Sequence, residues 1–275
     1  MRQPEAVAGD LGWATAALSR HGRLVRRVRV RFERLRPRHL RLGRQSDGDE
    51  LDVDACVIAA ADRRAGGIVD GRLYVAHRPV RRELTVGLLV DVSMSTDAWV
   101  SAQRRIVDVE KEALLVVCEA LDALGDPYGI FAFSGESADH VSVLTVKAFT
   151  EQNGEMIRRR IAALDCDRYT RIGAAVRHVT AALGRQPTRQ RLLLILSDGK
   201  PNDVDLYEGR YGVEDARQAA AEAKRQGIHV FCLTIDREAP RYAVRVFGAN
   251  GFAVLHRAEQ LPAVLIEAIR QLIRS

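Results

Sequence analysis

Residues 84–95 read LTVGLLVDVSMS, and this stretch decides the fold that we expect. Residues 84–90 are an almost unbroken apolar run, which is typical of a strand buried on both faces of a parallel sheet. The run stops at Asp91, and oxygen-bearing side chains then recur at Ser93 and Ser95. The carboxyl end of this strand therefore carries groups suited to chemistry or binding.

Working outward, the remaining sequence alternates between strand and helix patterns. Further strands are expected at 128–133, 141–146, 192–196, 228–235 and 252–255. Helices are expected at about 103–124, 153–164, 172–183, 241–247 and 260–273. A further Ala-rich helix is expected to end at Gly227. The strands at 128–133 and 141–146 are close enough in sequence to pair antiparallel.

This alternation predicts an α/β fold, with a doubly wound, mainly parallel sheet and helices on both faces. In such sheets ligands bind at the carboxyl ends of the strands. That edge is therefore where functional residues are expected.

Composition bounds the class of protein. The chain has 275 residues, 47% apolar and 28% charged, which excludes a wholly disordered or fibrous chain. No stretch approaches the ~20 apolar residues of a membrane-spanning helix, and the start lacks a secretory signal pattern. The four cysteines, 56, 118, 166 and 232, form no CxxC pair, so we expect free thiols. We expect a soluble, cytoplasmic protein.

The net charge of +6 is concentrated at the start of the chain, where residues 1–50 contain twelve arginines and six acids. Leu24, Val28, Phe32 and Leu35 recur with helical spacing, although residues 28–32 also alternate as in a strand. We therefore divide the chain into a partly helical basic arm at 1–46, a connecting segment at 47–83 and an α/β domain at 84–275.

Three functions remain open for the basic arm. It could dock on a protein partner or on its own domain, it could be a solvated surface, or it could contact nucleic acid or an anionic membrane. No aromatic stacking series and no nucleic-acid fold signature accompanies the arginines, so we do not expect a nucleic-acid partner.

Oxygen ligands occur at three expected strand ends or loops. Asp91, Ser93 and Ser95 follow the first strand, Thr170 precedes a helix, and Asp198 follows the strand at 192–196. Hydroxyls and carboxylates form a hard ligand set that suits Mg²⁺, with Mn²⁺ as the alternative. The sequence therefore predicts a divalent-ion site at these five residues.

The same residues resemble the metal-ion-dependent adhesion site of von Willebrand factor type A domains, and residues 84–275 are similar to that domain. The resemblance implies that Ser93, Ser95 and Thr170 contact the metal directly. Asp91 and Asp198 would act mainly through water or by orienting ligands. One metal position would stay open for a carboxylate of the partner. The chain departs from the family at Tyr169, where many members have glycine.

A narrower resemblance joins the chain to the NorD and CbbO family of activation factors, for nitric oxide reductase and Rubisco respectively. It rests on DGKPND at 198–203, YEGRYGVED at 207–215, GDELDVDA at 48–55, TIDRE at 234–238 and Phe247-Gly248. The resemblance implies a cytoplasmic adaptor that works with a MoxR-type AAA+ ATPase, with nitric oxide reductase as the favoured client and Rubisco as the alternative.

Residues around the expected metal edge are predicted to form a rim that contacts the partner, although the loop at 200–215 also reads as a solvated acidic loop. The rim residues are Tyr169, Lys200, Asn202, Asp203, Arg210 and Tyr211.

Several enzyme classes find no support. No GxxxxGK[ST] phosphate-binding loop and no GxSxG nucleophile motif occurs. Ser93 stands where a haloacid-dehalogenase-type phosphatase would have its second aspartate. A magnesium-dependent hydrolase and a domain that keeps the fold without metal remain as alternatives. We expect a binding module without catalytic residues.

Overall fold

A computed structural model describes residues 7–34, 40–68, 70–78, 84–97, 99–101, 104–137, 140–197, 209–234, 239–255, 260 and 264–269. These residues form two compact units. The larger unit combines residues 1–34 with residues 83–275, and the smaller contains residues 35–82.

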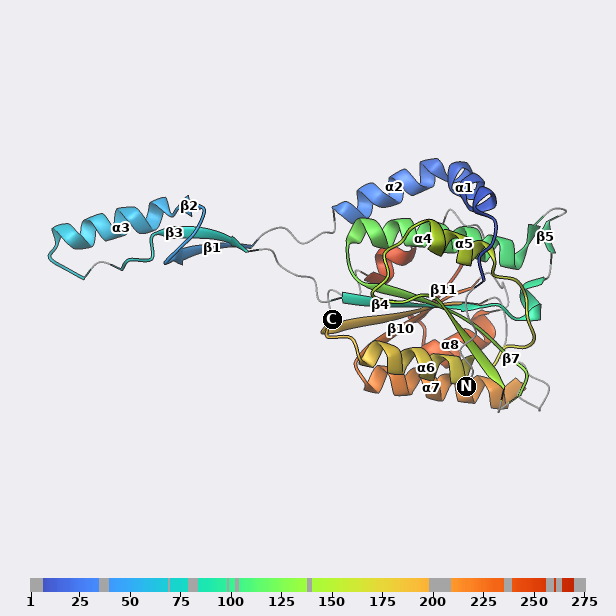
Figure 1. Ribbon diagram of the computed structural model, residues 1–275. Coiled ribbons are helices and arrows are strands. Elements are labelled where there is room, and N and C mark those ends of the chain that lie inside the picture. Colours follow the sequence, from blue (N-terminus) through green and yellow to red (C-terminus); the bar gives the residue numbers. More distant parts are fainter. Residues whose placement is uncertain are drawn as a thin grey trace. The chain divides into compact units, whose positions relative to one another are not determined.

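The larger unit is built on a six-stranded sheet in which four of the five strand pairings are parallel (Figure 1). In spatial order the strands are β11 (Phe252–Val254), β10 (Ile228–Thr234), β9 (Gln190–Leu196), β4 (Leu84–Asp91), β7 (Tyr128–Gly135) and β8 (Val141–Lys147). Only β8 runs against its neighbour β7. The expected doubly wound, mainly parallel sheet and its one antiparallel pair are thus confirmed.

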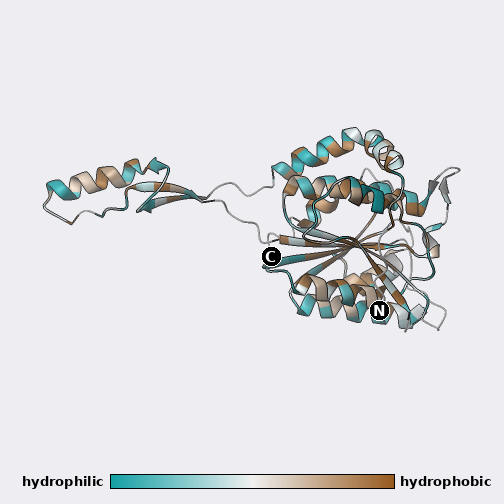
Figure 2. Cartoon of the chain, viewed as in Figure 1, coloured by the Kyte–Doolittle hydropathy of each residue, from teal (hydrophilic) through white to brown (hydrophobic). Residues whose placement is uncertain are grey.

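Helices cover both faces of this sheet (Figure 1). On one side lie α1 (Leu11–Arg20), α2 (Gly22–Glu33), α4 (Ile106–Leu124) and α5 (Glu155–Ala162). On the other side lie α6 (Ile172–Gly184), α7 (Gly209–Arg225) and α8 (Pro240–Phe247). Figure 2 shows apolar strands between helices whose outward surfaces are hydrophilic, as expected for a sheet buried on both faces.

Strand β4 occupies the middle of the sheet, and every one of its residues is buried. Its alternate residues face α6, and Gly87 permits a close approach. A Cβ atom at Gly87 would lie 3.1 Å from side-chain carbons of Val179 and Leu183 on that helix. The glycine therefore lets α6 pack directly on β4, which positions the start of α6 near the end of the strand.

The N-terminal helices pack on the larger unit through α4, which contacts both α1 and α2. Leu24, Val28 and Phe32, all predicted to share a helical stripe, are buried. The helical interpretation of this segment is confirmed and the strand alternative is wrong. Leu35 lies outside the described residues.

Charge pairs also join these helices to α4. Glu112 of α4 accepts from Arg20 at 2.9 Å and is paired with His21 at 2.8 Å. Glu119 of α4 is paired with Arg29 and, at 2.9 Å, with Arg158 of α5. Both acids are only 3% exposed. They are buried on the outer side of α4 because α1, α2 and α5 cover that side.

A short hairpin separates β4 from α4, where the sequence predicted a helix from residue 103. After the 3₁₀ turn η1 (Met94–Asp97), β5 (Trp99–Ser101) pairs antiparallel with β6 (Arg104–Arg105), and α4 begins at Ile106. Strand pairing keeps Arg104 and Arg105 out of the helix, and Arg105 instead caps it through a bond from its N–H to Asp108.

The smaller unit is a three-stranded antiparallel sheet with one helix. Its elements are β1 (Leu40–Gln45), β2 (Glu50–Leu51), α3 (Val53–Arg64) and β3 (Tyr74–Arg78), with β3 between the other two strands. Asp52 caps α3 by accepting from the N–H of Ala55 at 3.2 Å.

These units divide the chain differently from the boundaries that we expected at residues 46 and 83. Helices α1 and α2 belong to the larger unit because their apolar stripe is buried there, whereas β1 belongs to the smaller unit. The stretch expected to be a connecting segment contains β2, α3 and β3, so it is folded. Among the described residues, no helix combines the length and apolar character needed to cross a membrane.

Candidate metal-binding site

Three segments of the larger unit meet at the carboxyl edge of the sheet. They are the turn after β4, the loop 165–171 before α6, and the end of β9 beside β4. Parallel pairing of β4 with β9 brings Val90 opposite Leu196, so the residues that follow these two strands emerge side by side. The predicted ligands therefore come from neighbouring elements.

Asp91, Ser93 and Thr170 lie in one hydrogen-bonded group. The N–H of Ser93 donates to Asp91 Oδ1 at 3.0 Å. The Thr170 hydroxyl donates to Ser93 Oγ at 2.6 Å, although the two residues are 77 positions apart. The structure thus brings together three of the five residues predicted as ligands.

The group is shielded from water. Asp91 is fully buried, Ser93 is 1% exposed and Thr170 is 3% exposed. Burial raises the pKa of the Asp91 carboxyl to about 6, although hydrogen bonds from Ser197 and Ser93 oppose that rise. Among the described residues no arginine, lysine or histidine forms an ion pair with Asp91. A buried carboxylate without a counter-charge is unfavourable, and a bound cation would compensate it.

The donor set fits a hard divalent ion. The Ser93 and Thr170 hydroxyl oxygens lie 2.6 Å apart, and the Asp91 carboxylate is bonded to the backbone N–H of Ser93. One carboxylate and two hydroxyls are ligands that Mg²⁺ and Mn²⁺ accept. In the described part of the chain no three His, Cys, Asp or Glu side chains cluster as a candidate metal site. The chemistry of the residues therefore favours magnesium or manganese over a softer metal.

Backbone bonds hold the two ligand-bearing loops against each other. The N–H of Met94 donates to Arg168 O at 2.7 Å, and the N–H of Asp167 donates to Val92 O at 2.7 Å. Tyr169 and Gly135 exchange both backbone bonds at 2.8 Å, which ties the second loop to β7. Position 169 does not adopt the left-handed backbone conformation that favours glycine, so a tyrosine fits there. Arg168, the residue before it, adopts that conformation, with a φ of 50°.

The other predicted residues are placed less fully. Ser95 lies in η1, but its side chain is outside what the structure describes. Asp198, Lys200, Asn202 and Asp203 lie outside the described residues. Of the predicted rim, Tyr169 is 37% exposed and Tyr211 is 65% exposed, and Arg210 is also exposed at the start of α7.

Sequence reasoning missed two residues of the group. The Ser197 hydroxyl donates to Asp91 Oδ2 at 2.7 Å, and the Thr96 hydroxyl donates to Ser93 O at 2.6 Å. Ser197 directly precedes the predicted ligand Asp198 in the sequence. Its place at the end of the same strand could have indicated that it contributes to the group. Neither residue is a predicted ligand, but each hydroxyl holds a residue that is.

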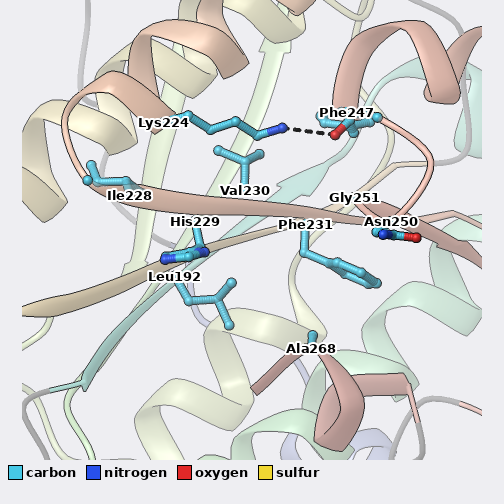
Figure 3. Close-up of a pocket in the computed structure, with 12 residues that line it drawn as sticks. Leu192, Lys224, Ile228, His229, Val230, Phe231, Phe247, Asn250, Gly251 and Ala268 are labelled. Carbon is cyan, nitrogen blue, oxygen red and sulfur yellow. Dashed lines mark hydrogen bonds between the residues drawn. The ribbon is translucent and has the colours of Figure 1, made fainter. Parts of the chain in front are cut away.

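A pocket of about 540 Å³ lies away from these residues (Figure 3). It is formed around the start of β10, at the amino edge of the parallel strands, and its lining is mainly apolar. Lys224, one of its few charged residues, donates to Phe247 O at 2.9 Å. A second pocket, about 420 Å³, is lined in part by Val92, Ser134 and Asp167. This second pocket adjoins the turn and the loop that carry the predicted ligands.

The chain is similar in sequence to a known domain family and to several known proteins. Residues 86–200 match the von Willebrand factor type A domain. The protein NorD of Brucella melitensis is 50% identical over 249 residues, which are 90% of this chain and 39% of that protein. The protein NorD of Stutzerimonas stutzeri is 44% identical over 248 residues, 89% of this chain and 40% of that protein. The chain spans about two fifths of the length of these curated relatives.

Solved structures share the fold at low sequence identity. The PilB minor pilin of Streptococcus sanguinis superposes with a TM-score of 0.53 at 14% identity, covering 72% of this chain and 64% of the pilin. The pilus adhesin SpaC of Lactobacillus rhamnosus GG gives 0.52 at 14% identity, covering 70% of this chain and 31% of the adhesin. At this identity the likeness concerns the fold alone.

Proposed function

The chain carries a von Willebrand factor type A domain and is related to the NorD proteins over 90% of its length, and from that premise we propose that it is a metal-dependent protein-binding adaptor. The observation that supports this most is the buried Asp91 carboxylate, which lies with two hydroxyls and no described counter-charge at the ligand-binding edge of the sheet. The proposed role is binding, without a catalytic residue.

Asp91, Ser93, Ser95, Thr170 and Asp198 would hold the ion, Mg²⁺ or Mn²⁺. The bound ion would supply a positive charge with one position open to a carboxylate of the partner. The chain's own contribution is rigidity. Ser197 and the Ser93 N–H hold the two oxygens of Asp91, and Thr96 holds the turn that carries Ser93. This orients the ligands before a partner arrives, which lowers the entropic cost of binding.

We propose nitric oxide reductase as the client, because the chain is similar in sequence to proteins named NorD. The client would offer an Asp or Glu to the ion. The rim residues Tyr169, Lys200, Asn202, Asp203, Arg210 and Tyr211 would contact it around that acid. A MoxR-type AAA+ ATPase is the proposed second partner, and the cytoplasm, where free thiols persist, is the proposed location.

Removal of one ligand hydroxyl tests the client assignment. The variant Thr170→Val keeps the shape of the side chain but removes the oxygen that bonds Ser93. We expect it to lose magnesium-dependent binding of purified nitric oxide reductase in a pull-down, while binding of the ATPase persists.

Thr180→Val is the matched control, since the Thr180 hydroxyl is buried in α6 and has no hydrogen-bond partner among the described residues. It should bind the reductase as the wild type does. Unchanged reductase binding by Thr170→Val, or equal loss in both variants, would contradict a role for the metal edge in client binding.

The outer face of α2 offers a separate surface for the ATPase. Arg23, Arg27 and Arg31 are exposed and follow one another at four-residue spacing, so they form one stripe, which we call the arginine stripe. None of the three forms an ion pair among the described residues. We propose that this stripe attracts an acidic surface of the ATPase, at a distance from the metal edge.

Charge reversal tests that surface without removing the helix. Arg27→Glu combined with Arg31→Glu should weaken ATPase binding roughly tenfold at low ionic strength, and the difference from wild type should shrink as salt is added. Arg185→Glu combined with Arg225→Glu makes the same change in net charge at other exposed positions and should have little effect. Isothermal titration at two salt concentrations would measure both. Equal effects of the two double variants would contradict a local role for the stripe.

A further inference from the structure

Two large apolar side chains are exposed near the carboxyl end of β4, one in the turn η1 and one in the hairpin β5–β6. Trp99 in β5 is 66% exposed and Met94 in η1 is 61% exposed. Tryptophan is mostly buried in folded proteins, and exposed tryptophan at protein surfaces is enriched in binding interfaces. Figure 1 shows the hairpin at the same end of the sheet as the carboxyl end of β4.

Arg105 fastens this hairpin to both ligand-bearing loops. It lies opposite Trp99 in the hairpin register. Its Nη1 donates to Asp97 Oδ1 at 3.0 Å, in the turn that follows Ser93, and to Asp165 Oδ1 at 3.2 Å, in the loop that leads to Thr170. A two-stranded hairpin of this length is not stable alone, so these bonds determine where Trp99 is held.

Further contacts join the turn to the second loop at Met94. The Met94 N–H bonds Arg168 O, and the Thr96 hydroxyl lies 3.2 Å from Cys166 Sγ. The turn that carries Met94 is therefore bonded to the loop that carries Tyr169 and Thr170. The hairpin that carries Trp99 is held to the same turn and loop by Arg105.

We propose that Met94 and Trp99 form an apolar anchor, which binds a large apolar side chain of the partner protein close in sequence to the acid offered to the ion. This inference rests on the proposed metal-dependent function, and it names the chemistry of the partner segment: an Asp or Glu with a bulky apolar neighbour. The ion binds a carboxylate from any source and discriminates little by itself. The apolar anchor adds selectivity, because buried aromatic residues at the centre of an interface contribute much of the binding energy.

Trp99 can report on its own burial. The chain has two tryptophans, and the other, Trp13, lies in α1 with Lys111 Nζ over its ring at 4.7 Å. A Trp13→Phe background leaves Trp99 as the single emitter. The variant is titrated with purified nitric oxide reductase at saturating magnesium, and the emission of the reductase alone is subtracted. We expect the emission maximum of Trp99 to shift to shorter wavelength and its quenching by acrylamide to decrease.

Affinity measurements complete the test. Trp99→Ala should weaken reductase binding about thirtyfold, the lower bound for a hot-spot residue, and should leave the melting temperature and its response to magnesium unchanged. Met156→Ala removes a side chain that is 55% exposed at the start of α5, and should bind as the wild type does.

The outcomes separate the anchor from the metal function. Binding that needs magnesium, fails in Asp91→Asn and weakens in Trp99→Ala supports both. Binding that needs magnesium but leaves Trp99 emission and the affinity of Trp99→Ala unchanged would overturn the anchor alone. Absence of reductase binding by the wild type would overturn the client assignment and the anchor together.

Discussion

Magnesium should raise the melting temperature of the wild-type protein, and Asp91→Asn should abolish that rise. An ion that binds the folded state alone stabilises it by about 2.7 kcal/mol at a hundredfold excess over its dissociation constant. For a domain of this size that corresponds to a shift of about 5–10 °C. The measurement is thermal unfolding followed by circular dichroism, with and without a chelator.

The same variant should be more stable than wild type when no metal is present. Asparagine keeps the shape of Asp91 and removes a fully buried charge that has no described counter-ion. Relief of that charge should stabilise the metal-free protein by roughly 1–3 kcal/mol. Asp91→Asn should therefore be more stable than wild type without metal, and its melting temperature should not change when magnesium is added.

Asp167→Asn is the control for this experiment. Asp167 lies in the second loop, and its carboxylate is 59% exposed and accepts from Ser134 at 3.1 Å. Its removal should leave the response to magnesium intact. An equal response in wild type and Asp91→Asn would exclude Asp91 as a ligand and, with it, the proposed metal-binding site.

Truncation of Phe32 should destabilise the larger unit by about 3–5 kcal/mol, the cost of a cavity left by a buried phenylalanine. Phe32 is fully buried at the end of α2, which contacts α4. Val30 lies on the same helix and is 43% exposed, so Val30→Ala should change stability by less than about 0.5 kcal/mol. Urea unfolding of Phe32→Ala, Val30→Ala and wild type would measure both effects.

This prediction distinguishes an integral helix pair from a detachable basic arm. A similar small effect of both substitutions would mean that α2 does not pack on the domain in solution. The burial of α2 against α4 also makes deletion of residues 1–46 a poor test of partner docking. Deletion would expose Glu112 and Glu119 of α4, which are now buried and paired with Arg20 and Arg29.

The parallel sheet and part of the candidate site could be predicted from the sequence because both depend on local patterns. The apolar run of β4 marks a strand buried on both faces, and its end marks the edge where ligands gather. The sequence placed Asp91 and Ser93 at the end of β4 and Thr170 in the loop before α6, and the structure brings these three residues together. The helical stripe of α2 was likewise legible in its spacing.

Tertiary structure alone decided which distant residues meet. Ser197 bonds Asp91 across 106 positions, and Arg29 reaches Glu119 across 90. Arg105 holds Trp99 beside the ligand loops because Asp165 lies 60 positions away in sequence but within reach in the fold. A periodic pattern states which side of an element is apolar, and it does not state which element covers that side. Strand order and crossovers decide which element covers it. They therefore decided that α1 and α2 belong to the larger unit and that Trp99 lies near the carboxyl end of β4.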